Sequence, residues 1–404
     1  MKCDEINLKG TFGIKLESIR VAEDGHISKK EHPFNDAHIS KDFAECQMEL
    51  ITDTFGSIYE VYSELKKMYR KVEGVLSESD VTREYIWPFS VPPVLVPGES
   101  INIAKFEKKD YYREHYRKLL AEKYDKKKML YCGIHYNYSF AEEYNIQNKN
   151  ERYLKLAAKA AEYAWLPVYL MGASPLHDIS LTSSDKYGVT VSGEEASIRC
   201  GKHGYWNHFT PVIDYTSFDG YINSIDNMVK EGLLYSESEL YYPVRLKCRG
   251  QYSLDNLRIS GAEYIEFRLL DINPLTPYGV FEEDLIFLHM LFVYLDSVDN
   301  KDFGEKAQKK ALDKVKLAAQ YDNTELAPEA KEVLESMKEY FSKITDERYM
   351  DALNYQYDKI NDESKMYSRI IVRECFGEYA GNMNAYGIAL MKKNASAIEQ
   401  EFGL

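Results

Sequence analysis

Five short segments of this chain alternate apolar and polar residues with a period of two, and no other sequence feature limits the fold as strongly. They are residues 12–21, 42–51, 131–140, 241–249 and 263–270. A period of two places apolar side chains on one face of a strand and polar side chains on the other. The pattern predicts an antiparallel sheet with one face packed against a core. Because helical patterns surround these segments, the expected fold class is α+β.

The polar faces of the predicted strands carry an unusual mixture of charged side chains. A single strand of this kind most often turns its polar face to solvent, but five such strands together favour a shared, covered face. The polar positions are Lys15, Glu17, Glu45, Gln47, Glu49, His135, Asn137, Ser139, Arg245, Lys247, Arg249, Glu266 and Arg268. Covering such a face would create a cavity that is rich in both metal ligands and anion-binding groups.

The chemistry of such a cavity suits phosphoryl transfer. Carboxylates, a neutral imidazole and an amide can coordinate Mg²⁺ or Mn²⁺. Arginine and lysine hold phosphate and carboxylate groups. A site with both sets can bind a metal–nucleotide complex beside an anionic substrate. The sequence contains none of the P-loop, Rossmann, G-x-S-x-G or H-E-x-x-H signatures, so the corresponding enzyme classes lose support.

The composition of the chain limits which kinds of partner it can bind and indicates the compartment in which it folds. The formal net charge is −14, which argues against nucleic acid as the main partner. Six cysteines without a C-x-x-C pair indicate reduced thiols. The first ten residues lack the apolar core of a signal peptide. The longest apolar stretch, residues 285–295, is shorter than the ~20 residues of a membrane-spanning helix. We expect a cytoplasmic protein with no membrane partner.

Helical periodicity appears in residues 57–70, in residues 151–164 and from about residue 303 onward. The charged stretch 296–310 is the best candidate for a junction. We expect it to connect two parts of one domain spanning residues 1–404. The sheet would lie within residues 1–295, and residues 296–404 would be mainly helical.

Several motifs follow one another in an order that resembles the bacterial glutamate–cysteine ligases (γ-glutamylcysteine synthetases). They are DFAECQMELIT (42–52), WPFSVP (87–92), GIHYNYS (133–139), GASP (172–175), SIR (197–199), GY (204–205), LYYPVR (240–245) and GAEYIEFRLLDINP (261–274). The resemblance covers residues 12 to about 290 with specific motifs. It is looser through the C-terminal helices, where SRI (368–370) is its clearest echo.

The resemblance implies a glutamine synthetase-like fold, in which a curved, mainly antiparallel sheet forms a funnel-like active site surrounded by helices. It also implies a reaction with ATP as co-substrate and Mg²⁺ or Mn²⁺ as cofactor. The γ-carboxylate of glutamate would be phosphorylated, and the amine of L-cysteine would then displace phosphate, which is the first step of glutathione biosynthesis. No ATP-grasp part follows, so the resemblance is to the ligase alone, and a separate glutathione synthetase would act downstream.

The same resemblance assigns roles to individual positions. It implies a metal role for Glu17, Asp42, Glu49, His135 and Glu266. It implies a catalytic role for Arg268 and Glu266, and Lys15, which departs from the family pattern, is a further catalytic candidate. It implies substrate binding by Tyr116, Arg117, Asn137, Arg199, Tyr205, Tyr241 and Arg245. Structural alternatives stay open: a strand cap at Asp42, a purely structural His135, a surface ion pair at Arg199, and packing roles for Tyr205 and Tyr241.

The chain departs from the family pattern at Lys15. This lysine stands where the family has an acidic residue that binds magnesium, so a positive charge replaces a negative one. We expect the ammonium group to replace one cation and to contact phosphate directly. In the two alternatives, a neighbouring carboxylate takes over the metal, or ATP turnover is weak or lost.

The function therefore has three candidates. The first is glutamate–cysteine ligase. The second is a γ-glutamyl ligase that uses a different amine in specialised metabolism. The third is a catalytically impaired paralogue that binds glutamate or nucleotide.

Overall fold

The computed structural model describes residues 8–78, 83–141, 145–299 and 301–404. The first seven residues, which include Cys3 and most of the segment read for a signal peptide, lie outside these ranges. The cysteines within the described ranges are Cys46, Cys132, Cys200, Cys248 and Cys375. All five are buried and none forms a disulfide, while their reduced state stays a prediction.

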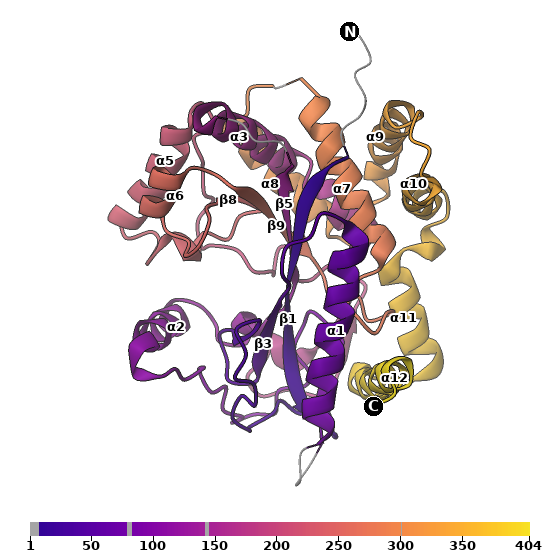
Figure 1. The fold of residues 1–404 in the computed structure, drawn as a ribbon. Coiled ribbons are helices and arrows are strands. Elements are labelled where there is room, and N and C mark those ends of the chain that lie inside the picture. Colours follow the sequence, from indigo (N-terminus) through magenta and orange to yellow (C-terminus); the bar gives the residue numbers. More distant parts are fainter. Residues whose placement is uncertain (1–7, 79–82, 142–144, 300) are drawn as a thin grey trace.

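An antiparallel sheet forms the centre of the molecule (Figure 1). Its longest strand is β1 (Gly10–Ala22), which pairs with β3 on one side and with β5 and then β4 on the other. The strand order is β2-β3-β1-β5-β9-β8, and β4 pairs with the end of β1. The other strands are β2 (Ile39–Lys41), β3 (Gln47–Ile51), β4 (Glu84–Ile86), β5 (Ile134–Phe140), β8 (Val244–Lys247) and β9 (Tyr264–Leu270).

The predicted antiparallel sheet is confirmed. Segment 12–21 lies within β1, and each of the other four alternating segments contains one strand. The sheet is open, with β2 and β8 at its edges. Because it does not close on itself, helices and loops form the walls around its polar face. The segment 42–51 is only partly extended, because residues 44–47 form a turn. There the side chain of Gln47 accepts a hydrogen bond from Ala44 N at 2.9 Å. The sequence did not predict β2, β4 or the small hairpin of β6 (Leu176–Asp178) and β7 (Thr190–Ser192).

The apolar face of the sheet packs against helices. Phe12, Ile14 and Leu16 are almost completely buried, as their alternation predicts. In Figure 1, α1 (Ile58–Ser77) and α7 (Glu282–Ser297) lie on the same side of β1. The ring of Phe12 contacts His289 of α7, with the ring centroids 4.6 Å apart. Sequence periodicity predicted part of α1, which begins after Ser57, whose side chain accepts a hydrogen bond from Glu60 N.

The remaining helices surround this core. Beyond residue 300 the described chain forms five α-helices, as predicted for this region, and none of its residues lies in a strand of a named sheet. No helix in the described ranges is long and apolar enough to cross a membrane. The helices are α2 (Tyr111–Lys123), α3 (Ile146–Glu162), α4 (Trp165–Met171), α5 (Phe218–Lys230), α6 (Leu254–Ser260), α8 (Glu305–Ala318), α9 (Ala327–Tyr340), α10 (Glu347–Asn361), α11 (Tyr367–Glu378) and α12 (Met383–Phe402).

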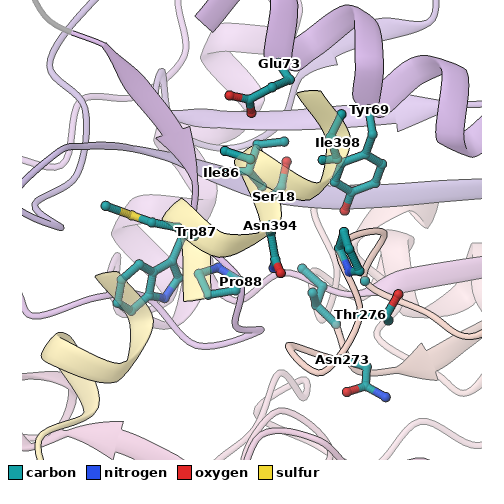
Figure 2. A pocket seen from close by; sticks show the side chains of 15 residues that line it. Ser18, Tyr69, Glu73, Ile86, Trp87, Pro88, Asn273, Thr276, Asn394 and Ile398 are labelled. Atoms are coloured by element: carbon teal, nitrogen blue, oxygen red, sulfur yellow. The ribbon is translucent and has the colours of Figure 1, made fainter. Parts of the chain in front are cut away.

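A small cavity lies between α1, α12 and the sheet (Figure 2). Ser18 of β1, Tyr69 of α1 and Asn394 of α12 contribute to its lining, together with Trp87 and Asn273. Because neighbouring strand residues point to opposite faces, Ser18 lies on the other side of β1 from Glu17. None of the residues with a predicted functional role lines this cavity.

Candidate active site

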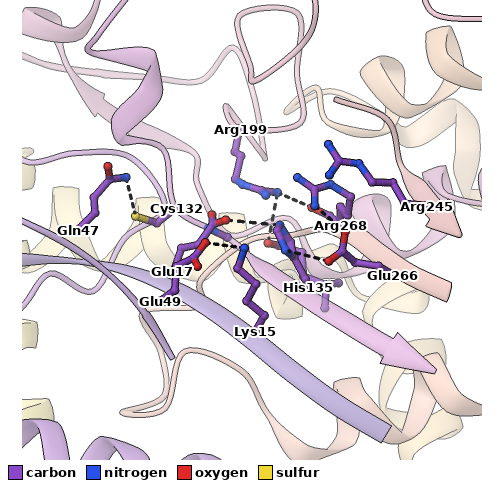
Figure 3. Close-up of polar contacts among 12 residues, drawn as sticks. Lys15, Glu17, Gln47, Glu49, Cys132, His135, Arg199, Arg245, Glu266 and Arg268 are labelled. Atoms are coloured by element: carbon purple, nitrogen blue, oxygen red, sulfur yellow. Dashed lines mark hydrogen bonds and ion pairs between the residues drawn. The ribbon is translucent and has the colours of Figure 1, made fainter. Parts of the chain in front are cut away.

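The strand register brings the predicted polar residues onto one face of the sheet (Figure 3). Lys15 of β1 lies opposite His135 of β5. Two residues further along β1, Glu17 lies opposite Glu49 of β3. Side chains of directly opposed residues in an antiparallel pair lie on the same face. Four residues that are far apart in the sequence therefore become neighbours in one patch.

The same face continues across β5, β9 and β8. Asn137 of β5 lies opposite Glu266 of β9, and Glu266 lies opposite Arg245 of β8. Arg268 follows two residues after Glu266 and shares its face. The Oδ1 atom of Asn137 is buried and has no hydrogen-bond partner among the described residues. Carboxylates therefore gather toward β3, and cations gather toward β8.

Three carboxylates form the acidic half of the site. Glu17, Asp42 and Glu49 each offer an oxygen atom, and these three atoms lie within 4.8 Å of one another. Backbone and hydroxyl groups hold two of them. Gly133 N donates a hydrogen bond to Glu17 Oε2 at 2.9 Å, and Ser40 Oγ donates one to Glu49 Oε2 at 3.1 Å. The trio is thus built from β1, β3 and the loop that follows β2.

Lys15 reaches into this carboxylate trio. Its Nζ atom lies 2.5 Å from Glu49 Oε1. Burial acts to lower the pKa of Lys15, but the charges of Glu49 and Glu17 raise it above its ordinary value. Burial, together with Glu49 and Glu17, raises the pKa of Asp42 to about 8. The raised pKa of Asp42 reflects its burial first and its two carboxylate neighbours second.

His135 lies between the trio and Glu266. Its Nε2 atom is 3.5 Å from Glu17 Oε1, and its Nδ1 atom is 3.8 Å from Glu266 Oε1. The side chain is buried, and neither ring nitrogen has a hydrogen-bond partner among the described residues. Burial and the charge of Arg268 lower the pKa of His135 well below its usual value. A neutral imidazole keeps one nitrogen lone pair, as a metal ligand requires.

This set of groups fits a hard divalent cation. Carboxylate oxygens are the ligands that Mg²⁺ and Mn²⁺ prefer, and a neutral imidazole can join them. Glu17, Asp42 and Glu49 could hold such an ion, with His135 beside them. The buried nitrogens of His135, which have no described partner, support this fit.

Glu266 anchors the cationic half of the site. Arg268 Nη1 donates a hydrogen bond to Glu266 Oε2 at 2.7 Å, and Lys247 Nζ lies 3.7 Å from Glu266 Oε1. Burial acts to raise the pKa of Glu266, but Lys247 and Arg268 hold it well below its ordinary value. Glu266 is therefore ionised and positions both cations.

Arg199 approaches this half from a loop. Its Nη1 atom donates to the carbonyl oxygens of Arg268, at 3.0 Å, and Leu270, at 3.5 Å. The guanidinium group lies directly over Gly133, where an added Cβ would come within 2.2 Å of Cζ. Only glycine at position 133 leaves room for Arg199 in this place.

Two predicted substrate-binding arginines hold backbone groups. Arg245 donates to the carbonyl oxygens of Leu240, at 2.9 Å, and Ser238, at 2.8 Å. Arg117 of α2 donates from Nε to the carbonyl oxygen of Asp42. Arg117 is therefore next to the carboxylate trio and fixes the loop that carries Asp42. Their substrate contacts remain predictions.

An aromatic pocket adjoins the cationic half. The rings of Tyr205 and Tyr241 lie 4.1 Å apart between centroids, and both line this pocket together with Trp206. Arg199 and Arg268 line the same pocket, so it opens onto the charged site. A pocket with aromatic walls and cationic ends suits a small molecule that carries a carboxylate.

Tyr116 lies near this pocket on α2. Burial raises its pKa to about 12. The pKa of Tyr241 is raised by burial and further by the neighbouring Tyr205 and Tyr116. The three tyrosines therefore form one group, as the resemblance implied for the acceptor pocket.

The structure thus gathers the predicted residues around one face of the sheet, although their roles remain predictions. The residues in or beside the charged site are Lys15, Glu17, Asp42, Glu49, Arg117, His135, Asn137, Arg199, Arg245, Glu266 and Arg268. Sequence reasoning did not select Lys247, Ser40 or Trp206 as site residues. The alternation of β8 already placed Lys247 on the polar face, whereas β2 is too short to reveal Ser40.

Comparisons with known proteins agree with this geometry. The family described as "Glutamate-cysteine ligase" matches residues 3–318. The glutathione biosynthesis bifunctional protein GshAB of Clostridium perfringens (strain 13 / Type A) is 32% identical over 408 residues, covering 91% of this chain and 52% of the relative. The GshAB protein of Listeria innocua is 36% identical over 310 residues, covering 70% of this chain and 40% of the relative. The chain thus spans about half the length of these relatives.

Solved structures share the fold. The crystal structure of a bifunctional glutathione synthetase from Pasteurella multocida has a TM-score of 0.83 at 28% identity, over 98% of this chain and 53% of that one. The structure of a glutamate–cysteine ligase from Francisella tularensis in complex with AMP has a TM-score of 0.85 at 22% identity. The match covers 97% of this chain and 89% of that one. Sequence match, fold and site geometry agree, and the chain belongs to the glutamate–cysteine ligase family.

Proposed function

We propose that this protein joins the γ-carboxylate of glutamate to the amine of L-cysteine at the expense of ATP. The observation that carries the proposal is the meeting of two opposite sets of charges on one sheet face. Glu17, Asp42 and Glu49 form a set of oxygen ligands, and Arg268 with Arg199 forms a set of phosphate-binding cations. Phosphoryl transfer from a metal–nucleotide complex to a carboxylate needs both sets in one place.

The first step of the proposed reaction makes an acyl phosphate. An oxygen of the glutamate γ-carboxylate attacks the γ-phosphorus of ATP, and the bond to the ADP oxygen breaks. Arg268 would bind the transferring phosphoryl group, because Glu266 holds its guanidinium on the site face. Mg²⁺, when bound, would neutralise charge on the phosphate oxygens. The AMP complex of the Francisella tularensis relative supports an adenine nucleotide as ligand.

The second step forms the amide. The cysteine nitrogen attacks the acyl carbon, phosphate leaves with the electron pair of the broken C–O bond, and the nitrogen loses one proton to the leaving phosphate or to water. Tyr205 and Tyr241 would hold the amine beside the acyl phosphate, since their pocket also contains Arg268. Aromatic walls exclude water, which would otherwise hydrolyse the acyl phosphate.

The proposal extends to the setting of the reaction. Residues 1–404 would act as one ligase domain, since α12 of the helical part packs against α1 beside the sheet. The product would be the substrate of a glutathione synthetase reaction. We place the reaction in the cytoplasm, where ATP and amino acids are supplied.

The test is an amine screen. Purified protein is incubated with ATP, Mg²⁺, glutamate and one amine at a time, and products are identified by mass spectrometry while phosphate release is measured. We expect γ-glutamylcysteine, with phosphate release that requires glutamate and the metal. A single product from another amine would reassign the acceptor, and no product with any amine would refute the ligase activity.

A further inference from the structure

We propose that the ammonium group of Lys15 fills the place of one divalent cation in this site. The protein would then bind one metal ion fewer per site than it would with a carboxylate at position 15, and Lys15 would serve as a covalently attached cation for the nucleotide phosphates. The inference rests on the proposed function, because it concerns the metal–nucleotide site of that ligase.

The contacts of Lys15 are those of a bound cation. Its Nζ atom lies 2.5 Å from Glu49 Oε1, and the charges of Glu17, Asp42 and Glu266 also act on it. One carboxylate therefore contacts the ammonium group, and the charges of three others, from two strands and one loop, act on it. An ammonium group is compact and positively charged, so it can replace a metal ion among carboxylate oxygens. It brings one positive charge, whereas the divalent ion brings two.

The position of Lys15 blocks a second ion. Glu17, Asp42 and Glu49 can together accept one divalent cation. A second ion would need His135 and Glu266, and Lys15 stands directly opposite His135 in the strand register. Glu266 is also occupied, because Arg268 and Lys247 contact it. Two divalent ions and an ammonium group would repel one another strongly within this short distance.

The side chain of Lys15 can turn toward a nucleotide. About 25% of it is exposed, whereas only 10% of the Glu49 side chain is exposed. An ion held by the carboxylate trio would repel the ammonium group, which would then turn from Glu49 toward the phosphates. Lysine binds phosphate as a point charge, so it can replace one metal–phosphate contact there.

The experiment counts Mn²⁺ ions bound per chain. Free Mn²⁺ is measured by electron paramagnetic resonance during titration of the full chain, with a nonhydrolysable ATP analogue present at saturation. Three variants are compared with the wild type. Lys15→Glu adds a carboxylate opposite His135, and Lys15→Gln removes the charge without adding a carboxylate. Lys67→Glu, at an exposed lysine of α1, reverses the same charge far from the site.

We expect Lys15→Glu to bind one more Mn²⁺ per chain than the wild type. Lys15→Gln should bind the wild-type number of ions with an affinity about tenfold higher or more, because one repulsive charge is gone. Lys67→Glu should match the wild type in both respects. Circular dichroism and thermal unfolding check that each variant is folded.

Equal ion counts in the wild type and in folded Lys15→Glu would overturn the inference. Unchanged Mn²⁺ affinity in Lys15→Gln would also overturn it, and this comparison decides the question if Lys15→Glu does not fold. The count is independent of turnover. If the amine screen yields no product but the counts differ by one, the ligase proposal fails while the role of Lys15 as a cation stands.

Discussion

The Nη1 atom of Arg268 lies 2.7 Å from Oε2 of Glu266, two residues away on the same face of β9. Both side chains are largely buried, so the hydrogen bond forms where water competes little. Glu266 keeps Arg268 from turning away from the site, and Lys247 balances the remaining charge at 3.7 Å. The pair fixes a guanidinium group where the proposed transfer of phosphate takes place.

Replacing Arg268 should abolish turnover. Arg268→Ala removes the cation that would stabilise charge on the transferring phosphoryl group, and loss of such an arginine costs about 10³-fold or more in rate. The measurement is ATP-dependent phosphate release with glutamate and cysteine. Arg258→Ala serves as the matched control, since Arg258 makes an exposed ion pair with Asp255 on α6. Near-normal rates in folded Arg268→Ala would remove Arg268 from the mechanism.

Gly133 sets the position of Arg199, so a single methyl group should disturb the site. In Gly133→Ala the new Cβ would lie 2.2 Å from Cζ of Arg199, which forces the guanidinium group to move. We expect the KM for ATP or glutamate to rise about tenfold or more, because a charged hydrogen bond is worth ~1.5–3 kcal/mol. Steady-state kinetics measure this change. Gly56→Ala, where an added Cβ meets no atom within 4 Å, should leave both constants unchanged.

The strand pattern predicted most of the side chains that share the site face. It was wrong for Glu45, which lies in a turn and pairs with Lys41, and for Arg249, which is exposed in a loop. Lys15 and Glu17 follow the alternation of β1. They share one face because Phe12, Ile14 and Leu16 are buried on the other. Burial of one face fixes the register of neighbouring strands, so the polar positions had to meet. The motif resemblance then added Asp42, which no periodicity could supply, because it lies in a loop.

Local turns and backbone contacts could not be predicted in the same way. The guanidinium group of Arg117 holds the carbonyl oxygen of Asp42, and this contact joins residues 75 positions apart. Such a contact depends on where α2 packs, which is a tertiary property without a sequence period. The alternation of β8 likewise predicted that Lys247 lies on the polar face. It could not predict the contact of Lys247 with Glu266, because that contact depends on side-chain conformation.

A buried ion pair far from the site should make stability depend on pH. Lys359 Nζ lies 3.5 Å from Asp284 Oδ1, and both side chains are almost completely buried. Burial lowers the pKa of Lys359 to about 8 from an ordinary value of 10.5, although Asp284 opposes this shift. Between these values the unfolded chain binds a proton that the folded chain has released. The free energy of unfolding therefore rises with pH in this window.

The measurement compares the wild type with the double variant Lys359→Met/Asp284→Asn, which removes both charges. The difference in free energy of unfolding, wild type minus variant, should increase by about 2 kcal/mol from pH 7.5 to pH 9.5. Urea unfolding at several pH values gives this difference. A difference that does not change with pH would show that Lys359 keeps an ordinary pKa in the folded protein.

Gly387 of α12 packs against Trp87, and this contact should limit what position 387 tolerates. A Cβ at this position would lie 2.1 Å from Cη2 of the indole ring. The ring cannot move away easily, because Trp87 is buried and its Nε1 atom donates to the carbonyl oxygen of Val91 at 2.9 Å. Gly387→Ala should therefore lower the free energy of unfolding by about 2 kcal/mol, despite the better helix propensity of alanine.

Gly74 of α1 provides the matched control. A Cβ there meets no atom within 4 Å, so Gly74→Ala should gain up to about 1 kcal/mol from helix propensity alone. Urea unfolding of both variants separates packing from propensity, because the two substitutions are chemically identical and both lie in helices. Equal stabilisation by the two substitutions would mean that α12 does not pack closely against Trp87 in solution. The wall that α12 forms beside the cavity in Figure 2 would then have to be placed differently.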